Sequence, residues 1–315
     1  MPKLYIPRIY TIIFFISIAF FSYACKDSEH NLIPNSNTEA TDTVANTRQL
    51  PESFKDYWYA GKAELTSYEL MQERYGEIRQ GMAVTVFVTE DFLPDVQVKA
   101  NTQSGENVSI LKLNTTKKFT TGIYPYSIMT STFNPVQEQQ HALKVSNSVQ
   151  EWCGQVYMQL NNRTKFELQS HSYFEGEADQ EATLDKTWLE DELWNLIRIN
   201  PEELPTGDVM LIPSFEYIRL RHKDIKAYQA KTNLKQGDSL SMYSIMFPAL
   251  ERELIIYFNS TFPYEIEKWE ETNGTQPNDS TRLKTTAYKI KRIRTDYWNL
   301  NRNKDAGLRD TLGLK

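Results

Sequence analysis

The feature that most constrains the fold is an alternation of apolar and polar or small side chains with a period of two residues. It is clearest at residues 82–89, where valine occupies every second position among other good strand formers. This period places successive side chains on opposite faces of a strand. The same alternation returns in segments 108–113, 155–160, 165–169, 218–221 and 288–291. Strands with one polar face suit antiparallel sheets that are solvated on one side.

Three segments refine this prediction. The continuous apolar run at residues 254–258 predicts a strand that is buried on both faces. The apolar positions slip from Ile290 to Ile293, which predicts a β-bulge. The polar stretch 161–164 lies between two predicted strands, so we expect a hairpin turn there.

One helix is predicted after residue 187. Thr187 and Glu190 have the spacing of a capping box, in which each side chain satisfies a free backbone amide of the first turn. Asn200-Pro201 should end the helix, with a further short helical turn at 202–203. The apolar stripe of this helix consists of Leu189, Leu193, Leu196 and Ile197.

Strands before and after this helix, without a βαβ rhythm, predict a mainly β fold of the α+β class. We expect an antiparallel curved sheet or open barrel, with the helix packed on or in its concave face. One strand-rich domain should span residues 51–305, with a polar loop at 271–281 and a charged, frayed tail at 306–315.

The N-terminus has the order of an export signal. Two basic residues precede an apolar run at 9–21, which is too short to span a bilayer as a helix. Ser22-Tyr23-Ala24-Cys25 follows and resembles the lipobox of bacterial lipoproteins. The resemblance implies removal of residues 1–24 and lipidation of the Cys25 thiol. An ordinary secretory signal with a chance cysteine, or an uncleaved anchor, would give a similar sequence.

The chain after Cys25 indicates a tethered envelope protein. Residues 25–50 are polar and have no apolar period, so we expect a flexible tether to the membrane. Lys26-Asp27-Ser28-Glu29 resembles a surface-export tag of Bacteroidota lipoproteins, although a polar linker could also begin this way. We therefore expect an outer membrane lipoprotein that faces either the periplasm or the cell surface.

Charge narrows the partners of such a protein. Residues 1–24 hold two of the 35 basic residues and none of the 41 acidic ones, so the remaining chain has a net charge of −8. An acidic surface argues against nucleic acid as a partner.

The first candidate site is the acidic stretch 171–179. His171, Glu175, Glu177 and Asp179 could supply paired carboxylates for acid–base catalysis or gather around a metal ion. No second histidine is near in the sequence, so a solvated acidic turn is the favoured interpretation. We predict no metal and no cofactor.

The other candidate residues are aromatic or sulfur-containing. Tyr124 and Tyr126 flank a predicted turn, where they could stack on a sugar or line a lipid pocket, or pack a corner of the core. Cys153 follows Trp152 as in thioredoxin redox motifs, but Val156 occupies the position of the second cysteine. We therefore predict a structural cysteine at the start of a strand.

Six stretches of the sequence carry a wider resemblance that covers most of residues 54–300. Together they resemble a family of Bacteroidota lipoproteins that often carry the label "septum formation inhibitor Maf" and have no established mechanism. Maf nucleotide pyrophosphatases have a Ser-x-Ser-Pro-Arg-Arg-type motif that this chain lacks, so no active-site residue is carried over. The stretches are 57–64 (Tyr-Trp-Tyr-Ala-Gly-Lys-Ala-Glu), 74–77 (Arg-Tyr-Gly-Glu), 88–92 (Val-Thr-Glu-Asp-Phe), 124–129 (Tyr-Pro-Tyr-Ser-Ile-Met), 151–155 (Glu-Trp-Cys-Gly-Gln) and 172–177 (Ser-Tyr-Phe-Glu-Gly-Glu).

Three hypotheses of function follow. The favoured one is a non-enzymatic envelope module that binds an apolar ligand or another envelope protein. The second is a hydrolase of envelope glycans or lipids that uses the acidic stretch 171–179. The third, a Maf-type pyrophosphatase, is disfavoured because export would separate the chain from nucleoside triphosphates.

Overall fold

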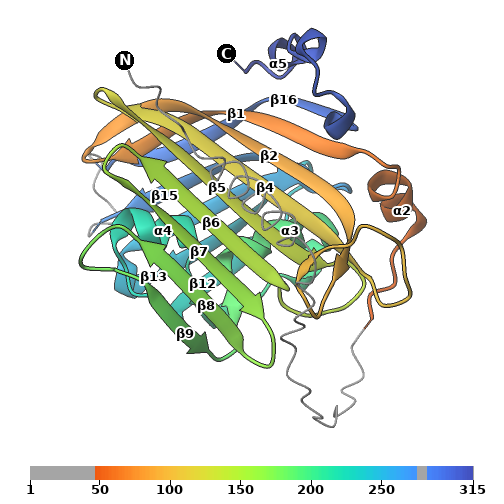
Figure 1. Cartoon of the computed structure of the whole chain (residues 1–315), viewed down its shortest axis with the longest axis horizontal. Helices are drawn as coiled ribbons and strands as arrows, with labels where there is room; N and C mark the ends of the chain where they lie inside the picture. Colours follow the sequence, from red (N-terminus) through yellow and green to blue (C-terminus); the bar gives the residue numbers. More distant parts are fainter. Residues whose placement is uncertain (1–46, 275–281, 315) are drawn as a thin grey trace, which may run out of the picture. The chain divides into compact units, whose positions relative to one another are not determined.

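One large curved sheet that does not close into a barrel dominates the structure (Figure 1). The computed structural model describes residues 47–274 and 282–314. Within these residues, sixteen strands join the sheet in the order β10-β11-β12-β13-β14-β15-β16-β1-β2-β4-β5-β6-β7-β8-β9, and β3 pairs with β2. Neighbouring strands are antiparallel except β10 and β11, which are parallel. The predicted mainly β fold with a curved antiparallel sheet is therefore confirmed.

The strands and helices have the following bounds. The first half of the sheet consists of β1 (Ala63–Arg74), β2 (Glu77–Leu93), β3 (Val98–Lys99), β4 (Val108–Thr121), β5 (Tyr124–Pro135), β6 (Lys144–Glu151), β7 (Gly154–Asn162), β8 (Phe166–Ser172) and β9 (Gln180–Leu184). The second half consists of β10 (Trp188–Leu189), β11 (Gly207–Ile212), β12 (Tyr228–Lys235), β13 (Leu240–Phe247), β14 (Arg252–Asn259), β15 (Ile266–Asn273) and β16 (Lys284–Thr295). The helices are α2 (Glu52–Trp58), α3 (Glu190–Ile199), α4 (Phe215–Arg221) and α5 (Leu308–Thr311), with short 3-10 helices η1 (Pro201–Glu203), η2 (Pro248–Leu250), η3 (Tyr297–Asn299) and η4 (Asn303–Asp305).

The two halves of the sheet meet where β1 pairs with β16. The first long strand of the domain is thus paired on both sides, by β2 and by β16. A tight hairpin connects β1 to β2 beside this seam. In the β1–β2 turn, Tyr75 and Gly76 both have positive φ, at 57° and 73°, which is the backbone of a type I′ turn.

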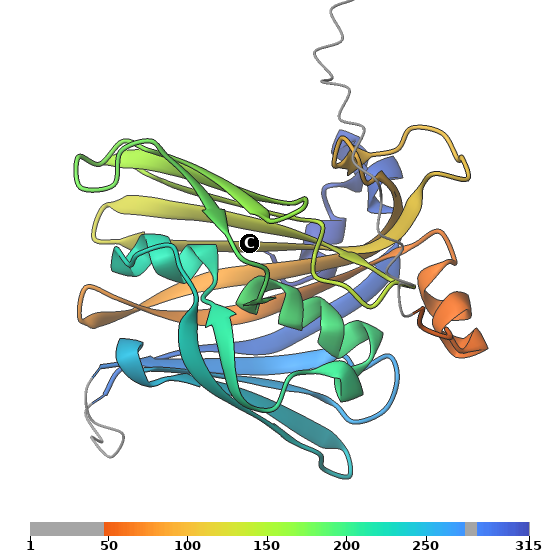
Figure 2. The same ribbon diagram turned by 90° about the horizontal axis from the view of Figure 1, so that it is seen from below.

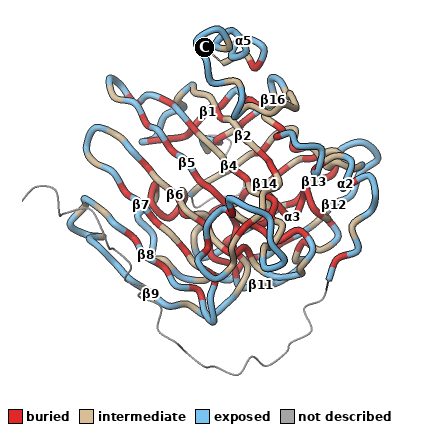
Figure 3. Tube along the Cα trace, turned by 45° about the vertical axis from the view of Figure 1, so that its right-hand side comes forward, coloured by how far each residue is buried: buried red, intermediate tan, exposed pale blue. Residues whose placement is uncertain are grey.

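Helices α3 and α4 lie on the concave side of the sheet (Figure 2). The larger core cluster packs Leu193 and Leu196 of α3 against strand residues such as Phe87 and Trp269. A second cluster packs Phe215 and neighbouring α4 residues against β7 and β8. Figure 3 shows buried positions along the strands around α3 and exposed positions in the turns. The concave face is therefore filled by two helices and their side chains.

Several local predictions are confirmed. Val156, Met158 and Leu160 form the buried face of β7, as the alternation predicted. A turn joins β7 to β8 at residues 163–165. The register of β16 against β1 shifts between Ser67 and Tyr68, which skips Ile290 and confirms the bulge.

The predicted strand at 218–221 is wrong, because these residues belong to α4. Ser214 caps this helix by accepting a hydrogen bond from the Tyr217 amide at 3.3 Å. Ile218 and Leu220 are both buried, although they are separated by two positions. An apolar pair at that spacing fits one turn of a buried helix as well as a short strand.

The run 254–258 is buried on one face and not on two. Leu254, Ile256 and Phe258 are buried, whereas Ile255 and Tyr257 are partly exposed. The continuous apolar pattern was therefore misleading, because a partly exposed strand face can also carry apolar residues.

The predicted start of the helix is also wrong. Helix α3 begins at Glu190, and the Glu192 carboxylate accepts from the Leu189 amide at 3.0 Å. The Thr187 hydroxyl instead donates to the Met210 carbonyl at 2.6 Å, beside strand β10. The apolar stripe, the stop at Asn200 and the following helical turn are confirmed.

Three further predictions need correction. Cys153 lies in the exposed β6–β7 turn, one residue before β7 begins. The segment that we expected to fray contains α5, and Leu312 is buried with its carbonyl accepting from the Ser67 hydroxyl at 2.5 Å. The expected polar loop at 271–281 starts later, because β15 continues to Asn273, and 275–281 lie outside the described residues.

Candidate functional site

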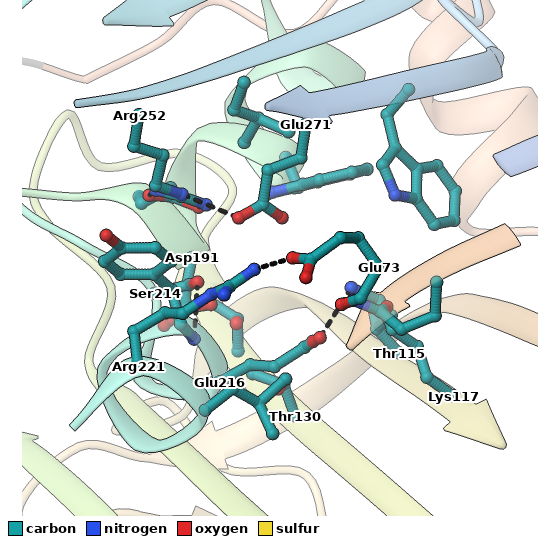
Figure 4. A pocket seen from close by; sticks show the side chains of 18 of the residues that line it. Glu73, Thr115, Lys117, Thr130, Asp191, Ser214, Glu216, Arg221, Arg252 and Glu271 are labelled. Carbon is teal, nitrogen blue, oxygen red and sulfur yellow. Dashed lines mark hydrogen bonds and ion pairs between the residues drawn. The ribbon is translucent and has the colours of Figure 1, made fainter. Parts of the chain in front are cut away.

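A small cavity lies between the concave face of the sheet and the helices α3 and α4 (Figure 4). Strands β1, β4, β5, β14 and β15 form one wall and the two helices form the other. Its volume is about 50 Å³, which is enough for a few water molecules. Segments far apart in the sequence meet here, so no local motif could reveal this cavity.

Arg252 of β14 joins two acidic residues at this cavity. Its Nη2 donates to Glu190 Oε1 at 2.7 Å, and its Nε donates to Glu271 Oε1 at 2.9 Å. The side chains of Arg252 and Glu190 are 1% and 2% exposed. Burial alone would raise the pKa of Glu271, but the positive charges of Arg252 and then Lys117 hold it below its ordinary value. This buried arginine ties α3 to two strands of the sheet.

Two more ion pairs connect α4 to strands at the cavity. Arg221 pairs with Glu73 of β1, and the Nζ of Lys117 on β4 lies 2.8 Å from Glu216 Oε1. Figure 4 shows both pairs pointing into the same space as Arg252 and Glu271. Because these carboxylates already have cationic partners, a charged ligand would have to displace one of them.

Asp191 differs from the other acids of the cavity. Within the described residues it forms no ion pair, and its Oδ2 accepts from the Phe215 amide at 3.2 Å. Burial, followed by the negative charge of Glu190, raises the pKa of Asp191 to about 7. Asp191 can therefore exchange a proton near neutral pH, in a place where α3 meets the start of α4.

Trp269 adds an unpaired donor to the cavity wall. Its indole N–H is buried and has no hydrogen-bond partner among the described residues. Its ring meets Trp194 of α3 edge to face, with the centroids 5.3 Å apart. A buried donor beside a small polar cavity suits an ordered water molecule. The cavity is far smaller than the roughly 300–1,000 Å³ of typical small-molecule pockets, so neither a saccharide nor an acyl chain fits in it.

The structure divides the predicted acidic stretch 171–179 into two parts. His171 Nδ1 lies 3.4 Å from Asp179 Oδ1, and both side chains are largely exposed. Glu177 instead accepts from the Ser172 hydroxyl at 2.7 Å and lies 2.6 Å from His222 Nδ1. The four predicted residues therefore do not converge on one point.

Part of that stretch lines a separate pocket of about 410 Å³. Glu175 and Glu177 line it together with His222, which follows α4. His171 and Asp179 are not among its lining residues. The pairing of His222 with Glu177 could not be predicted from a local pattern, because 45 residues separate the two. The only local signal of His222 was its place directly after an apolar segment that was assigned to a strand.

The two candidate tyrosines belong to the core. Tyr126 is 2% exposed and stacks on Phe119, with centroids 4.8 Å apart and planes at 7°. Its hydroxyl lies 2.8 Å from that of Tyr75. Tyr124 packs against Tyr126 at 5.9 Å and is partly buried. Of the alternatives considered for this pair, the packed core corner is the one that the contacts match.

The remaining features to report are the lipidation candidate, metal binding and membrane-spanning helices. The lipidation candidate Cys25 lies outside the described residues. Among the residues that are described, no group of three or more His, Cys, Asp or Glu side chains could hold a metal ion. None of the helices in residues 47–274 and 282–314 combines the length and apolar character needed to cross a bilayer.

Comparisons with known proteins gave no relative. No family model matches the chain, and neither curated proteins nor solved structures gave a match.

Proposed function

We propose that the protein is a membrane-anchored envelope lipoprotein that acts as a non-enzymatic scaffold by contacting another envelope protein. The filled concave face supports contact with a protein over carriage of an apolar ligand. Helices α3 and α4 occupy this face, and the cavity beneath them is small, polar and internally paired. Binding in this proposal takes place on the outer surface of the domain.

The observation that carries the proposal is a row of exposed apolar side chains at one end of the sheet. Tyr75, Ile123, Trp152 and Tyr173 lie at the β1–β2, β4–β5, β6–β7 and β8–β9 turns, and are 57%, 82%, 69% and 75% exposed. The antiparallel order of these strands places all four turns at the same end (left side of Figure 1). We call this set the hairpin row. Large apolar residues gathered on one surface are typical of interaction sites.

Charge favours a protein as the partner of the hairpin row. Glu77, Glu151 and Glu175 lie in or next to the same turns. These acids oppose insertion among anionic lipid headgroups. They are compatible with the polar rim that surrounds apolar anchors in protein interfaces.

The place where the described chain begins agrees with this orientation. Thr47, the first described residue, bridges to Glu138 in the β5–β6 loop, at the end of the sheet opposite to the hairpin row. A lipid on Cys25 would thus be tethered to the other end of the domain. Under this proposal, the hairpin row can point away from the anchoring membrane.

A crosslinking experiment tests the partner. A photoreactive amino acid at Ile123 or Trp152, introduced into the full chain in living cells, should give one discrete crosslinked species. The same label at Leu240, 38% exposed at the opposite end, should not give it. Serine at Ile123, Trp152 and Tyr173 together should abolish the complex recovered with a label at Tyr75. Equal crosslinking from Leu240, or crosslinks to lipid alone, would refute the partner contact.

The anchor is tested separately. Replacing Cys25 by Ser should abolish incorporation of labelled palmitate and release the chain from the membrane fraction. Unchanged labelling in Cys25→Ser would show that the lipid is not on this residue, whatever the outcome for the hairpin row.

A second function is favoured by the pocket that contains Glu175, Glu177 and His222. A carboxylate 2.6 Å from an imidazole nitrogen is an arrangement used in acid–base hydrolysis of glycans or lipids. In this alternative, Glu177→Gln removes release of products from peptidoglycan or phospholipid, while Glu181→Gln on β9 retains it. Equal activity of the two variants, or none in the unmodified chain, would dismiss a hydrolase at this pocket.

A further inference from the structure

A larger hollow lies outside both the ion-paired cavity and the hairpin row. Its volume is about 700 Å³, and it is lined by the β5–β6 loop, the segment 186–188, α3, η1 and Arg48. This volume is within the usual range for pockets that hold small organic ligands. We call it the Trp188 groove.

Arg48 fixes one wall of the Trp188 groove. Its Nη1 donates to the carbonyls of Pro135, Val136 and Glu138 at 3.0, 3.1 and 2.8 Å. Its Nε donates to both carboxylate oxygens of Glu203 at 2.9 and 2.8 Å. These bonds hold the β5–β6 loop against η1, so this wall is preorganised.

Glu192 of α3 fixes His141, another lining residue of the groove. This carboxylate is fully buried, accepts from the Ala142 amide at 2.6 Å and from the Leu189 amide at 3.0 Å, and lies 2.8 Å from His141 Nδ1. Because Nδ1 is engaged with Glu192, the Nε2 of His141 is the ring nitrogen left for a ligand. The imidazole is 24% exposed, so it can be reached from the groove.

Aromatic and amide groups share the same groove. Trp188 meets His141 edge to face, with centroids 5.1 Å apart and planes at 83°. Gln139, Gln140 and Asn162 add side-chain amides to the lining. A flat aromatic ring beside several polar hydrogen-bonding groups suits a ligand with apolar C–H faces and many hydroxyls, which is the chemistry of a saccharide.

The charge of the groove differs from that of the chain. Among its lining residues, Arg48 and Lys186 are positive and Glu203 is negative, a net of +1 before His141 is counted. The whole chain has a net charge of −6. Arg48 and Glu203 compensate each other, whereas Lys186 forms no ion pair with a described residue in the groove. The ammonium of Lys186 is therefore available to an anionic group.

We propose that the Trp188 groove binds an acidic saccharide. The ring of Trp188 packs on a sugar face, His141 Nε2 and the amides bind hydroxyl groups, and Lys186 pairs with the carboxylate of the ligand. A purely apolar ligand would leave the Lys186 ammonium and His141 Nε2 without partners in the groove, at a cost in affinity. This inference is independent of the protein contact proposed for the hairpin row.

The test is an oligosaccharide array. It carries oligouronates, sialylated chains and muramic-acid-containing chains beside their neutral counterparts, and is probed with the purified full chain in a detergent without sugar groups. We expect at least one acidic saccharide to bind more tightly than its neutral counterpart. Trp188→Ala should weaken that binding by about tenfold or more. Lys186→Ala should reduce the preference for the acidic over the neutral form by about fivefold.

Two controls separate recognition from folding. Trp188→Phe keeps a ring and should retain most of the affinity, whereas Trp298→Ala removes an exposed ring of η3, outside both the groove and the hairpin row, and should change nothing. The proposal is overturned if no acidic saccharide binds, if neutral saccharides bind equally well, or if Trp188→Ala and Trp298→Ala have the same effect.

Discussion

At the scale of single residues, Asp191 makes the stability of the domain depend on pH. Its pKa is raised to about 7 in the folded chain, so folding takes up a proton between the ordinary value and pH 7. The resulting stabilisation is complete at low pH and is lost as the pH rises through about 7. We expect the free energy of unfolding, relative to Asp191→Asn, to fall by up to about 1.4 kcal/mol per pH unit in that range.

Urea unfolding of the full chain between pH 4.5 and 8 measures this dependence. The exposed Asp208→Asn serves as a control and should run parallel to the unmodified chain. If the unmodified chain and Asp191→Asn have the same pH profile, Asp191 is not protonated on folding.

The buried pair of Arg198 and Glu64 is a second determinant at this scale. Two bonds of 2.7 Å join them, and both side chains are 1% exposed. Arg198→Met removes two charged hydrogen bonds from the buried Glu64 carboxylate and leaves it Arg292 at 3.5 Å, so this change should cost up to about 3–5 kcal/mol of unfolding free energy. The double variant with Glu64→Gln should recover part of this loss. Chemical denaturation tests both, with the exposed Arg302→Met as a neutral control.

At the scale of elements, α3 is the piece that fills the concave face. Leu193 is fully buried in the larger core cluster. Leu193→Ala should therefore destabilise the chain by about 2–5 kcal/mol. The matched variant Leu308→Ala alters a side chain of α5 that is 40% exposed. It should change the free energy of unfolding by no more than about 0.5 kcal/mol. Equal midpoints in urea for these two variants would contradict the role of α3 in the core.

The sequence predicted the inner face of α3 but not its start. The apolar stripe from Leu189 to Ile197 follows the helical period of 3.6 residues, because the face that packs on the sheet has to be apolar. The cap depends on a choice between Thr187 and Glu192, and β11 decides it because its Met210 carbonyl accepts from the Thr187 hydroxyl. Helix α4 was predicted as a strand, because seven residues are too few to distinguish the helical period of 3.6 residues from the strand period of two.

The candidate sites were less predictable than the elements. Glu177 was named from its acidic neighbours, but its imidazole partner His222 comes from a distant loop. Asp191 is one of three acidic residues in the first turn of α3, and its pKa is raised to about 7 by burial and by the neighbouring charge of Glu190, which the sequence does not reveal. Such properties arise from contacts between segments and have no local pattern.

At the scale of the whole molecule, alternation predicted the class of the sheet and not its strand order. The pairing of β1 with β16 joins residues more than 200 positions apart, and no turn in the sequence marks it. This pairing puts β1 in the middle of the sheet and leaves β9 and β10 at its ends.

This order predicts a gradient of backbone protection. β1 is paired on both sides and largely buried, whereas β9 is mostly exposed and pairs with β8 alone among the described strands. Edge amides open by local fluctuations, while central amides need larger unfolding events. Hydrogen–deuterium exchange followed by mass spectrometry should therefore show peptides of β9 exchanging much faster than those of β1 and β2. If β9 were protected as strongly as β1, a second chain would have to cover this edge in solution.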